Sequence, residues 1–98
     1  MKIWYVTSEC APFSKSGGLA DVAFSLPPVL KQLGDDVEIV TPLYSCVQER
    51  FGHDLTLRGS WPIRLRDQVM NVDVYRGERA GVPVWFMLPL TPLVQWHL

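Results

Sequence analysis

The N-terminal half of the chain contains two short apolar runs with a helical repeat between them. Residues 2–7 and 37–41 are rich in apolar and β-branched side chains, which predicts two strands, the first of them buried. Gly34 follows the repeat where a helix would end, and Pro27-Pro28 should kink the helix or begin a second helical piece. Strand, helix and strand in this order predict a βαβ unit with parallel strands. The apolar residues of the repeat, at spacings of three and four, are Leu19, Val22, Ala23, Leu26, Leu30 and Leu33.

The second half of the chain has a different pattern, with more strand-like segments. Residues 43–52 predict one or two helical turns. Three apolar or alternating runs predict strands, and the glycine-containing segment between the last two predicts a hairpin turn. We find no internal repeat and no low-complexity linker. The strands are expected at residues 61–65, 69–75 and 82–87, and the turn at residues 76–81.

Composition narrows the possible functions of this 98-residue chain. Hydrophobic residues make up 48% and charged residues 19%, with a net charge of −1, which is typical of a globular protein. A chain without a positive excess is not expected to bind nucleic acid or an anionic membrane through bulk charge. The apolar stretch from residue 82 onwards is broken by prolines and is too short to span a bilayer, and no targeting segment is visible. Cys10 and Cys46 form neither a disulfide framework nor a CxxC pair, so a reducing cytoplasm is expected.

The segment Lys15-Ser16-Gly17-Gly18-Leu19 carries the clearest chemical signal. It lies in the loop after the first predicted strand, where open α/β sheets bind their ligands. A helix N-terminus presents free N–H groups, glycines allow an anion to approach closely, and lysine adds a full positive charge. The segment therefore predicts a phosphate or diphosphate cradle. The residues alone equally allow a solvated lysine and two glycines in a tight turn, and both the G-x-G-x-x-G and the G-x-x-x-x-G-K-[ST] fingerprints are absent.

Other chemically capable side chains receive simpler interpretations. We expect Cys10 to be a small buried hydrophobe, and Tyr44 to pack at the end of the second strand. His53 and His97 lack the spacing of metal ligands, so no metal site is expected. Core or interface packing is the expectation for all four tryptophans. These are Trp4, Trp61, Trp85 and Trp96.

The candidate loop lies within a longer string, Val6-Thr7-Ser8-Glu9-Cys10-Ala11-Pro12-Phe13-Ser14-Lys15-Ser16-Gly17-Gly18-Leu19-Ala20-Asp21-Val22. Further matching segments follow at Leu26-Pro27, Leu33-Gly34, Asp36-Val37 and Pro42-Leu43-Tyr44. Together they resemble the start of bacterial glycogen synthases and plant starch synthases, whose hallmark is Lys-x-Gly-Gly-Leu.

This resemblance implies an α/β fold, namely a partial Rossmann-like domain from the N-terminal half of a two-domain GT-B glycosyltransferase, with a β-hairpin excursion. It implies a retaining hexosyltransferase that moves glucose from ADP-glucose to the non-reducing end of an α-1,4-glucan in the cytoplasm, without a metal or other cofactor. By the same resemblance, Lys15 would contact the diphosphate of the nucleotide sugar, and Gly17 and Gly18 would line that site through their backbone. Asp21, one helical turn beyond Gly17, would face the sugar or the acceptor.

The resemblance also marks what residues 1–98 lack. The family is several times longer, so the chain is expected to be an incomplete N-terminal domain whose further partner is the C-terminal domain of the parent chain. The principal catalytic residues of the family lie in that second domain, so no catalytic residue and no independent activity are expected here. From about residue 88 to 98 the apolar, proline-broken tail leaves the family pattern, as in a truncated or frameshifted reading frame. The alternative is a non-catalytic nucleotide- or anion-binding module derived from this fold, and the residues alone do not decide between an ADP-sugar and a UDP-sugar.

Overall fold

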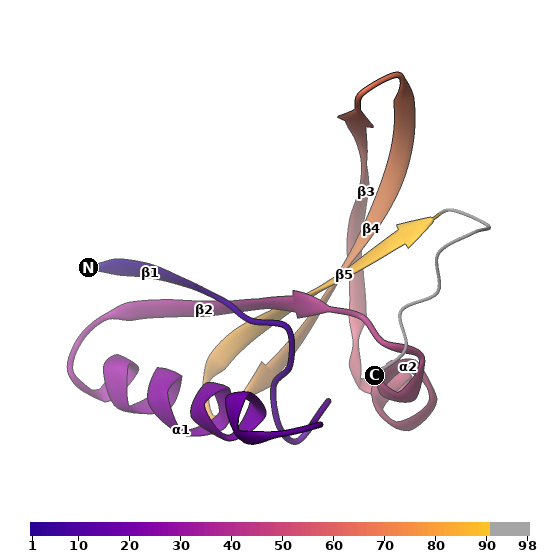
Figure 1. Ribbon diagram of the computed structural model, residues 1–98. Coiled ribbons are helices and arrows are strands. Elements are labelled where there is room, and N and C mark those ends of the chain that lie inside the picture. Colours follow the sequence, from indigo (N-terminus) through magenta and orange to yellow (C-terminus); the bar gives the residue numbers. More distant parts are fainter. Residues whose placement is uncertain (91–98) are drawn as a thin grey trace.

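The strands of residues 1–90 form one mixed sheet in the order β1-β2-β5-β4-β3 (Figure 1). The computed structural model describes these residues, with Leu65 described by its backbone only. β1, β2 and β5 run parallel to one another, whereas β4 is antiparallel to both β5 and β3, so the expected α/β class is confirmed. No helix in this part of the chain has the length and apolar character needed to cross a bilayer. The elements are β1 (Lys2–Val6), α1 (Gly18–Gln32), β2 (Asp36–Pro42), α2 (Ser45–Phe51), a 3-10 turn (Gly52–Asp54), β3 (Thr56–Leu65), β4 (Gln68–Arg79) and β5 (Val82–Leu90).

The βαβ unit predicted from the sequence is present as β1, α1 and β2. The Thr7 N–H donates to the Val40 carbonyl at 3.0 Å, which extends the parallel pairing one residue beyond β1. α1 includes Pro27 and Pro28 as parts of a single helix, without the division into two pieces that the prolines allowed. Gly34 has a φ of +98° and its N–H donates to the Lys31 carbonyl at 3.0 Å, which confirms it as the residue that ends the helix.

α1 packs against β2 and β5 through small side chains and not through the predicted stripe of large ones. Ala20, Ala23 and Pro27 are the buried residues of the helix. Small side chains at this face allow the helix to lie close to the sheet. The spacing of three and four therefore predicted the helix, but most of the large side chains in it point to a side that no other element of residues 1–90 covers. The exposed apolar residues of the helix and its C-terminus are Leu19, Val22, Phe24, Leu26, Val29 and Leu33.

The core lies between α1, α2 and one face of the sheet. Ile39 of β2 and Val84 and Phe86 of β5 are at most 1% exposed. The Phe13 ring packs edge-on against the rings of Phe86 and Phe51, with 5.1 Å between centroids in both pairs. Cys10 belongs to the same cluster and is fully buried, which confirms its interpretation as a buried hydrophobe.

The opposite face of β1 and β2 has no covering layer within the described residues (Figure 1). Trp4 is 53% exposed and Val6 75% exposed, so β1 is an exposed edge strand and not the buried strand expected from its sequence. Trp61 on β3 is also exposed, so neither it nor Trp4 is a core residue. Trp85 is half-buried, and Trp96 lies outside the described residues.

The antiparallel half of the sheet is longer than the sequence pattern predicted. Residues 76–79 are the end of β4, paired with the start of β5, and the turn is reduced to Ala80 and Gly81, with φ of +51° and +77°. The expected turn over residues 76–81 was therefore wrong, because a glycine among charged residues resembles a turn. Gly77 instead faces the core, where an added Cβ would lie 2.8 Å from Leu55 and 3.2 Å from Phe86. β3 begins at Thr56, five residues before the predicted start, and a bulge lies between Leu57 and Gly59.

Candidate functional site

The predicted loop lies at the carboxyl end of β1 and leads directly into α1. The helix begins at Gly18, and Gly17 occupies the N-cap position with no side chain to cap the helix. The structure brings the four candidate residues Lys15, Gly17, Gly18 and Asp21 to this one end of the helix. The unpaired N–H groups of a helix N-terminus carry partial positive charge, so this is the end that favours an anion.

A carboxylate of the protein itself already occupies part of this helix end. The Glu9 side chain accepts hydrogen bonds from the backbone N–H groups of Ser16 (2.8 Å), Gly17 (3.1 Å) and Ala20 (3.2 Å), and from the Ser16 hydroxyl (2.5 Å). The residue is only 4% exposed. These donors, the Ser16 hydroxyl above all, hold the pKa of Glu9 below its usual value of 4.5, so the carboxylate is ionised at neutral pH.

Glu9 is not among the site residues predicted from the sequence. The available signal was indirect: α1 has no Ser, Thr, Asp or Asn at its N-cap, so its first N–H groups need an acceptor from elsewhere. An acidic residue between a strand and such a helix is a candidate for that acceptor. Glu9 lies eleven residues before Ala20, so the sequence does not show that the two residues are hydrogen-bonded.

Two N–H groups of the helix start are left over by Glu9. Gly18 and Leu19 are the first two residues of α1, and neither donates to an acceptor within residues 1–90. Both residues are exposed. A ligand can therefore reach these two N–H groups from solvent.

Lys15 and Asp21 form an ion pair across the loop. Lys15 Nζ lies 2.8 Å from Asp21 Oδ1, and the two side chains are 56% and 58% exposed. Exposed pairs of this kind contribute at most about 1 kcal/mol, so an incoming anion can displace the carboxylate at small cost. The lysine is thus held at the helix end and remains available.

The two glycines have no structural need to be glycine. Neither Gly17 nor Gly18 has a positive φ. A Cβ added at Gly18 would meet nothing within 4 Å, and one at Gly17 would make only an ordinary contact with Glu9 Oε1 at 3.9 Å. A tight turn that requires glycine therefore does not explain this pair.

The loop before the helix is fixed to the sheet by polar contacts. The Tyr44 hydroxyl donates to the Ser8 carbonyl at 2.5 Å, and the Thr7 hydroxyl donates to the Glu9 carbonyl at 2.8 Å. Tyr44 is 7% exposed, which confirms its packing at the end of β2, and burial is the main cause that raises the pKa of its hydroxyl. Ser14 Oγ accepts from the Cys10 N–H at 3.1 Å, and the Ser14 N–H donates to the Cys10 carbonyl at 2.8 Å. The site therefore rests on an ordered support.

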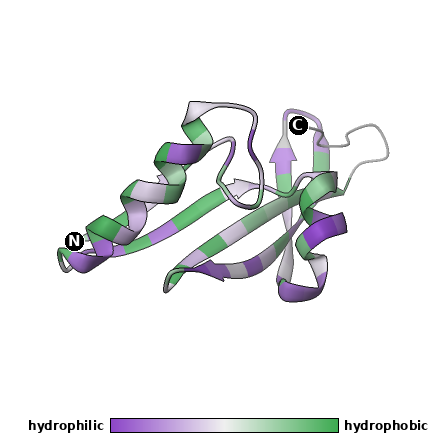
Figure 2. Ribbon diagram, turned by 90° about the horizontal axis from the view of Figure 1, so that it is seen from below, coloured by the Kyte–Doolittle hydropathy of each residue, from purple (hydrophilic) through white to green (hydrophobic). Residues whose placement is uncertain are grey.

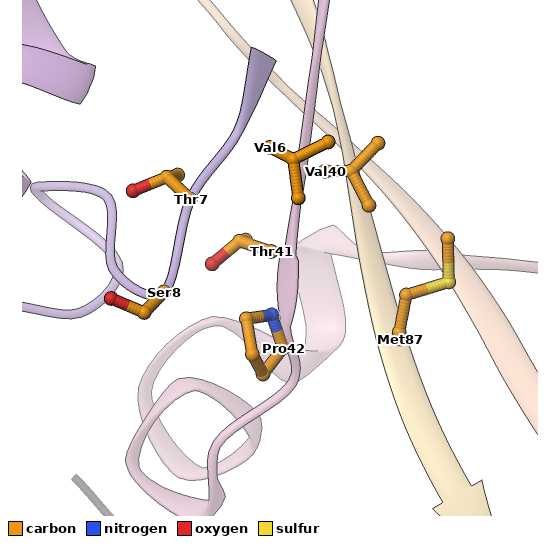
Figure 3. A pocket seen from close by; sticks show the side chains of 7 residues that line it. All are labelled: Val6, Thr7, Ser8, Val40, Thr41, Pro42 and Met87. Atoms are coloured by element: carbon orange, nitrogen blue, oxygen red, sulfur yellow. The ribbon is translucent and has the colours of Figure 1, made fainter. Parts of the chain in front are cut away.

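A hollow of about 330 Å³ also lies at the carboxyl ends of the parallel strands (Figure 3). Val6, Val40 and Met87 point to one side of the sheet in this view, and Thr7 and Thr41 to the other. The hollow has no charged side chain, so it does not suit a phosphate. We interpret it as part of the uncovered apolar face of the sheet.

Within residues 1–90, the His, Cys, Asp and Glu side chains form no group of three or more that lies close enough together to hold a metal ion. His53 is exposed and lies 3.5 Å from Asp54, whereas His97 lies outside the described residues. The two cysteines in this part of the chain are free thiols.

Comparison with known proteins identifies the family to which this sequence and fold correspond. A family model described as "Starch synthase catalytic domain" matches residues 2–93. Proteins named glycogen synthase are 44% identical to the chain over 88 residues in Geotalea uraniireducens, 39% over 87 residues in Finegoldia magna and 40% over 89 residues in Bacillus cereus. Each match covers 89% of this chain and 18% of the relative, so the chain spans about a fifth of the length of the relatives that it matches.

The fold of the chain is also similar to that of a solved starch synthase structure. The catalytic domain of starch synthase IV from Arabidopsis thaliana, bound to ADP and acarbose, superimposes with a TM-score of 0.80 at 29% sequence identity. The match covers 91% of this chain and 18% of that protein.

Proposed function

The chain belongs to the starch synthase catalytic domain family, and from this membership we propose that it supplies the diphosphate-binding loop of a glycogen or starch synthase. The reaction that we propose for the whole enzyme is transfer of glucose, with retention, from ADP-glucose to the non-reducing end of an α-1,4-glucan. No metal or other cofactor is required in this proposal. The structural relative bound to ADP and acarbose supports a nucleotide and a glucan as the ligands.

The observation that carries the proposal is the pair of glycines at the start of α1. The fold tolerates a Cβ at both positions, because neither residue has a positive φ or a close neighbour there. Glycine at a position where the protein leaves open space is expected when a ligand must approach the backbone. Gly17 and Gly18 therefore form the wall of the proposed phosphate site.

The neighbouring groups have complementary roles in this proposal. The free N–H groups of Gly18 and Leu19 would donate to phosphate oxygens, and Lys15 would leave Asp21 to pair with the diphosphate. Asp21, released from the lysine, would then face the sugar or the acceptor. The Gly17 N–H is bound to Glu9, so this residue would contribute a close surface and no hydrogen bond.

We also propose that residues 1–98 are an incomplete N-terminal Rossmann-like domain. The uncovered faces of β1 and α1 support this, because α/β sheets with parallel strands are normally covered on both faces. Catalytic groups would then come from the rest of the enzyme, and the chain alone would not transfer glucose.

The direct test is a titration of the ¹⁵N-labelled 98-residue chain with ADP, followed by NMR. We expect the signals of Gly18, Leu19 and Lys15 to shift together, and AMP to bind more weakly because it lacks the second phosphate. Gly18→Ala should weaken ADP binding by roughly tenfold or more, because the added Cβ would occupy the space through which a phosphate approaches the backbone. UDP in place of ADP tests the choice of base.

Stability separates a binding defect from a folding defect in these variants. Gly18→Ala should leave the free energy of unfolding unchanged, or raise it by about 0.5–1 kcal/mol, because alanine is the better helix residue. Lys15→Ala should also keep the fold and lose ADP affinity. If both variants bound ADP as well as the unmodified chain, the proposed loop function would be wrong.

Glucosyl transfer itself is best tested in a chimaera. Residues 1–90 of this chain would replace the matching segment of the Geotalea uraniireducens glycogen synthase, which is 44% identical over 88 residues. We expect the chimaera to use ADP-glucose and to lose that activity with Lys15→Ala. A chain that binds ADP but gives an inactive, folded chimaera would favour the non-catalytic binding module.

A further inference from the structure

Glu9 has an unusual number of partners for a side chain that belongs to neither the strand nor the helix. Its Oε1 accepts from the N–H groups of Gly17 and Ala20, and its Oε2 accepts from the N–H and the hydroxyl of Ser16. Both oxygens are thus used twice, in a residue that is 4% exposed. Such a carboxylate fixes the positions of three consecutive parts of the chain: the loop, the N-cap and the first helical turn.

This arrangement differs from an ordinary helix cap. A capping side chain belongs to the N-cap residue itself and accepts from the second or third N–H of the helix. Glu9 does accept from the third, that of Ala20, but its other donors lie before the helix. Ser16 and Gly17 are the residues that join Lys15 to Gly18, so the extra bonds act on the proposed ligand loop.

The backbone around Glu9 is itself held in place. The Thr7 hydroxyl donates to the Glu9 carbonyl at 2.8 Å, and the Tyr44 hydroxyl donates to the neighbouring Ser8 carbonyl at 2.5 Å. These contacts attach the backbone that carries the carboxylate to the residues that follow β1 and β2. The position of the loop is therefore determined by the sheet through Glu9.

We propose that Glu9 is the positioning residue of the diphosphate loop: its carboxylate holds Ser16, Gly17 and Ala20 so that Lys15 and the free N–H groups of Gly18 and Leu19 face the same ligand. The inference rests on the function proposed above for this loop. Glu9 itself does not touch the ligand in this arrangement, because its oxygens are occupied by the protein.

Because Glu9 is negatively charged, its two possible effects on ADP binding have opposite directions. A carboxylate beside an anion site repels the anion, so removal of its charge alone should strengthen ADP binding. Loss of the loop geometry should weaken it. Glutamine in place of Glu9 removes the charge with little change in size, and it turns an NH₂ donor toward groups that are themselves donors.

The experiment uses the ¹⁵N-labelled 98-residue chain and the variant Glu9→Gln. In the unmodified chain, we expect the N–H signals of Ser16, Gly17 and Ala20 to titrate together below pH 4.5, the usual pKa of the group. In Glu9→Gln this titration should disappear, and exchange of these N–H groups with solvent should accelerate by roughly 10- to 100-fold. ADP binding should weaken by roughly tenfold despite the lost negative charge.

Two further variants separate this role from a general loss of structure. Glu38 is a second carboxylate with a lowered pKa, which accepts from Trp85 Nε1 at 3.0 Å, and Glu38→Gln should leave the loop signals and ADP binding unchanged. Ser16→Ala removes only the hydroxyl donor of an exposed residue. It should raise the pKa of Glu9 toward its usual value and weaken ADP binding by a smaller factor in the same direction.

The outcomes are distinct for the inference and for the proposed function. Tighter or unchanged ADP binding by a folded Glu9→Gln chain would overturn the positioning role, as would Gly17 and Ala20 signals that ignore both pH and the substitution. Should Glu9→Gln unfold, the Ser16→Ala comparison decides the same question. An unmodified chain that does not bind ADP would count against the proposed function, and the N–H titrations would then decide alone whether Glu9 holds the loop.

Discussion

Among single residues, the two cysteines differ sharply in their surroundings. Cys10 is fully buried, and burial raises the pKa of its thiol to about 11, whereas Cys46 is half-buried. Because the thiolate is the reactive form, a buried thiol that stays protonated is inert at neutral pH. We expect a thiol reagent to modify Cys46 alone in the folded chain, and Cys10 only after denaturation. Peptide mass spectrometry would read out both sites, and equal labelling rates in the folded chain would contradict the burial of Cys10.

Two carboxylates make the fold sensitive to acid. The Ser16 hydroxyl lowers the pKa of Glu9, and the Trp85 indole N–H lowers that of Glu38. A group with a lowered pKa in the folded state stabilises the fold fully above its unfolded pKa, and this contribution disappears as the pH falls through the folded value. The free energy of unfolding should therefore decline below pH 4.5. Urea unfolding across this range should show that the free energy of unfolding falls less steeply with pH in Glu9→Gln and in Glu38→Gln than in the unmodified chain. If both variants lost stability as steeply as the unmodified chain, these two groups would not be the cause.

The position of the site could be predicted from local sequence, but the hydrogen bonds and the ion pair within it could not. Lys15, Gly17, Gly18 and Asp21 lie within seven residues, and a strand, a loop and a helix suffice to bring them together. Glu9 reaches Ala20 only after the intervening loop has folded back, and no spacing rule identifies that contact. For the same reason the pairing of Lys15 with Asp21 became visible only in the structure.

Among the elements, the C-terminus of α1 depends on a glycine in a conformation that other residues avoid. Gly34 has a φ of +98°, whereas Gly52 at the end of α2 has a φ of −54°. Neither glycine has an atom within 4 Å of an added Cβ. Gly34→Ala should therefore lower the free energy of unfolding by about 1–2 kcal/mol through backbone strain alone.

Gly52→Ala is the matched control for that substitution. It adds the same methyl group at a helix end, but in an ordinary helical conformation, so its effect should be neutral or slightly stabilising. Denaturant unfolding of the two variants measures the difference. Equal stabilities would mean that the φ of Gly34 does not determine how α1 ends.

The elements also explain where sequence patterns misled. The period of three and four correctly predicted a helix, but the large side chains of that period face outward, and Ala20, Ala23 and Pro27 face the sheet. A hydrophobicity pattern gives most weight to large residues. In this helix it therefore marks the outer face, and the small residues that pack on the sheet contribute little to the pattern. Figure 2, seen from the α1 side, shows hydrophobic residues recurring along this helix.

At the scale of the whole molecule, residues 1–90 leave apolar surface uncovered on both sides of the layered structure. α1 covers one face of the parallel strands (Figure 1). The outer side of this helix is apolar. The other face of the sheet presents Trp4 and Val6. Among the described residues β1 pairs only with β2, so none of them covers the other edge of the strand. Exposed apolar faces and an unpaired strand edge both promote association.

We therefore expect the 98-residue chain to self-associate and to bind the dye ANS when studied alone. Val6→Lys should reduce both effects, because it places a charge on the exposed face of the edge strand. Val69→Lys is the matched control: Val69 is 67% exposed against 75% for Val6, but it lies on the β3–β4 hairpin, away from β1. Sedimentation velocity over a range of micromolar concentrations would separate the two variants. If the chain were a monomer at all concentrations and gave no ANS signal, the exposed apolar surfaces would not drive association. The proposal of an incomplete domain would then lose its physical support.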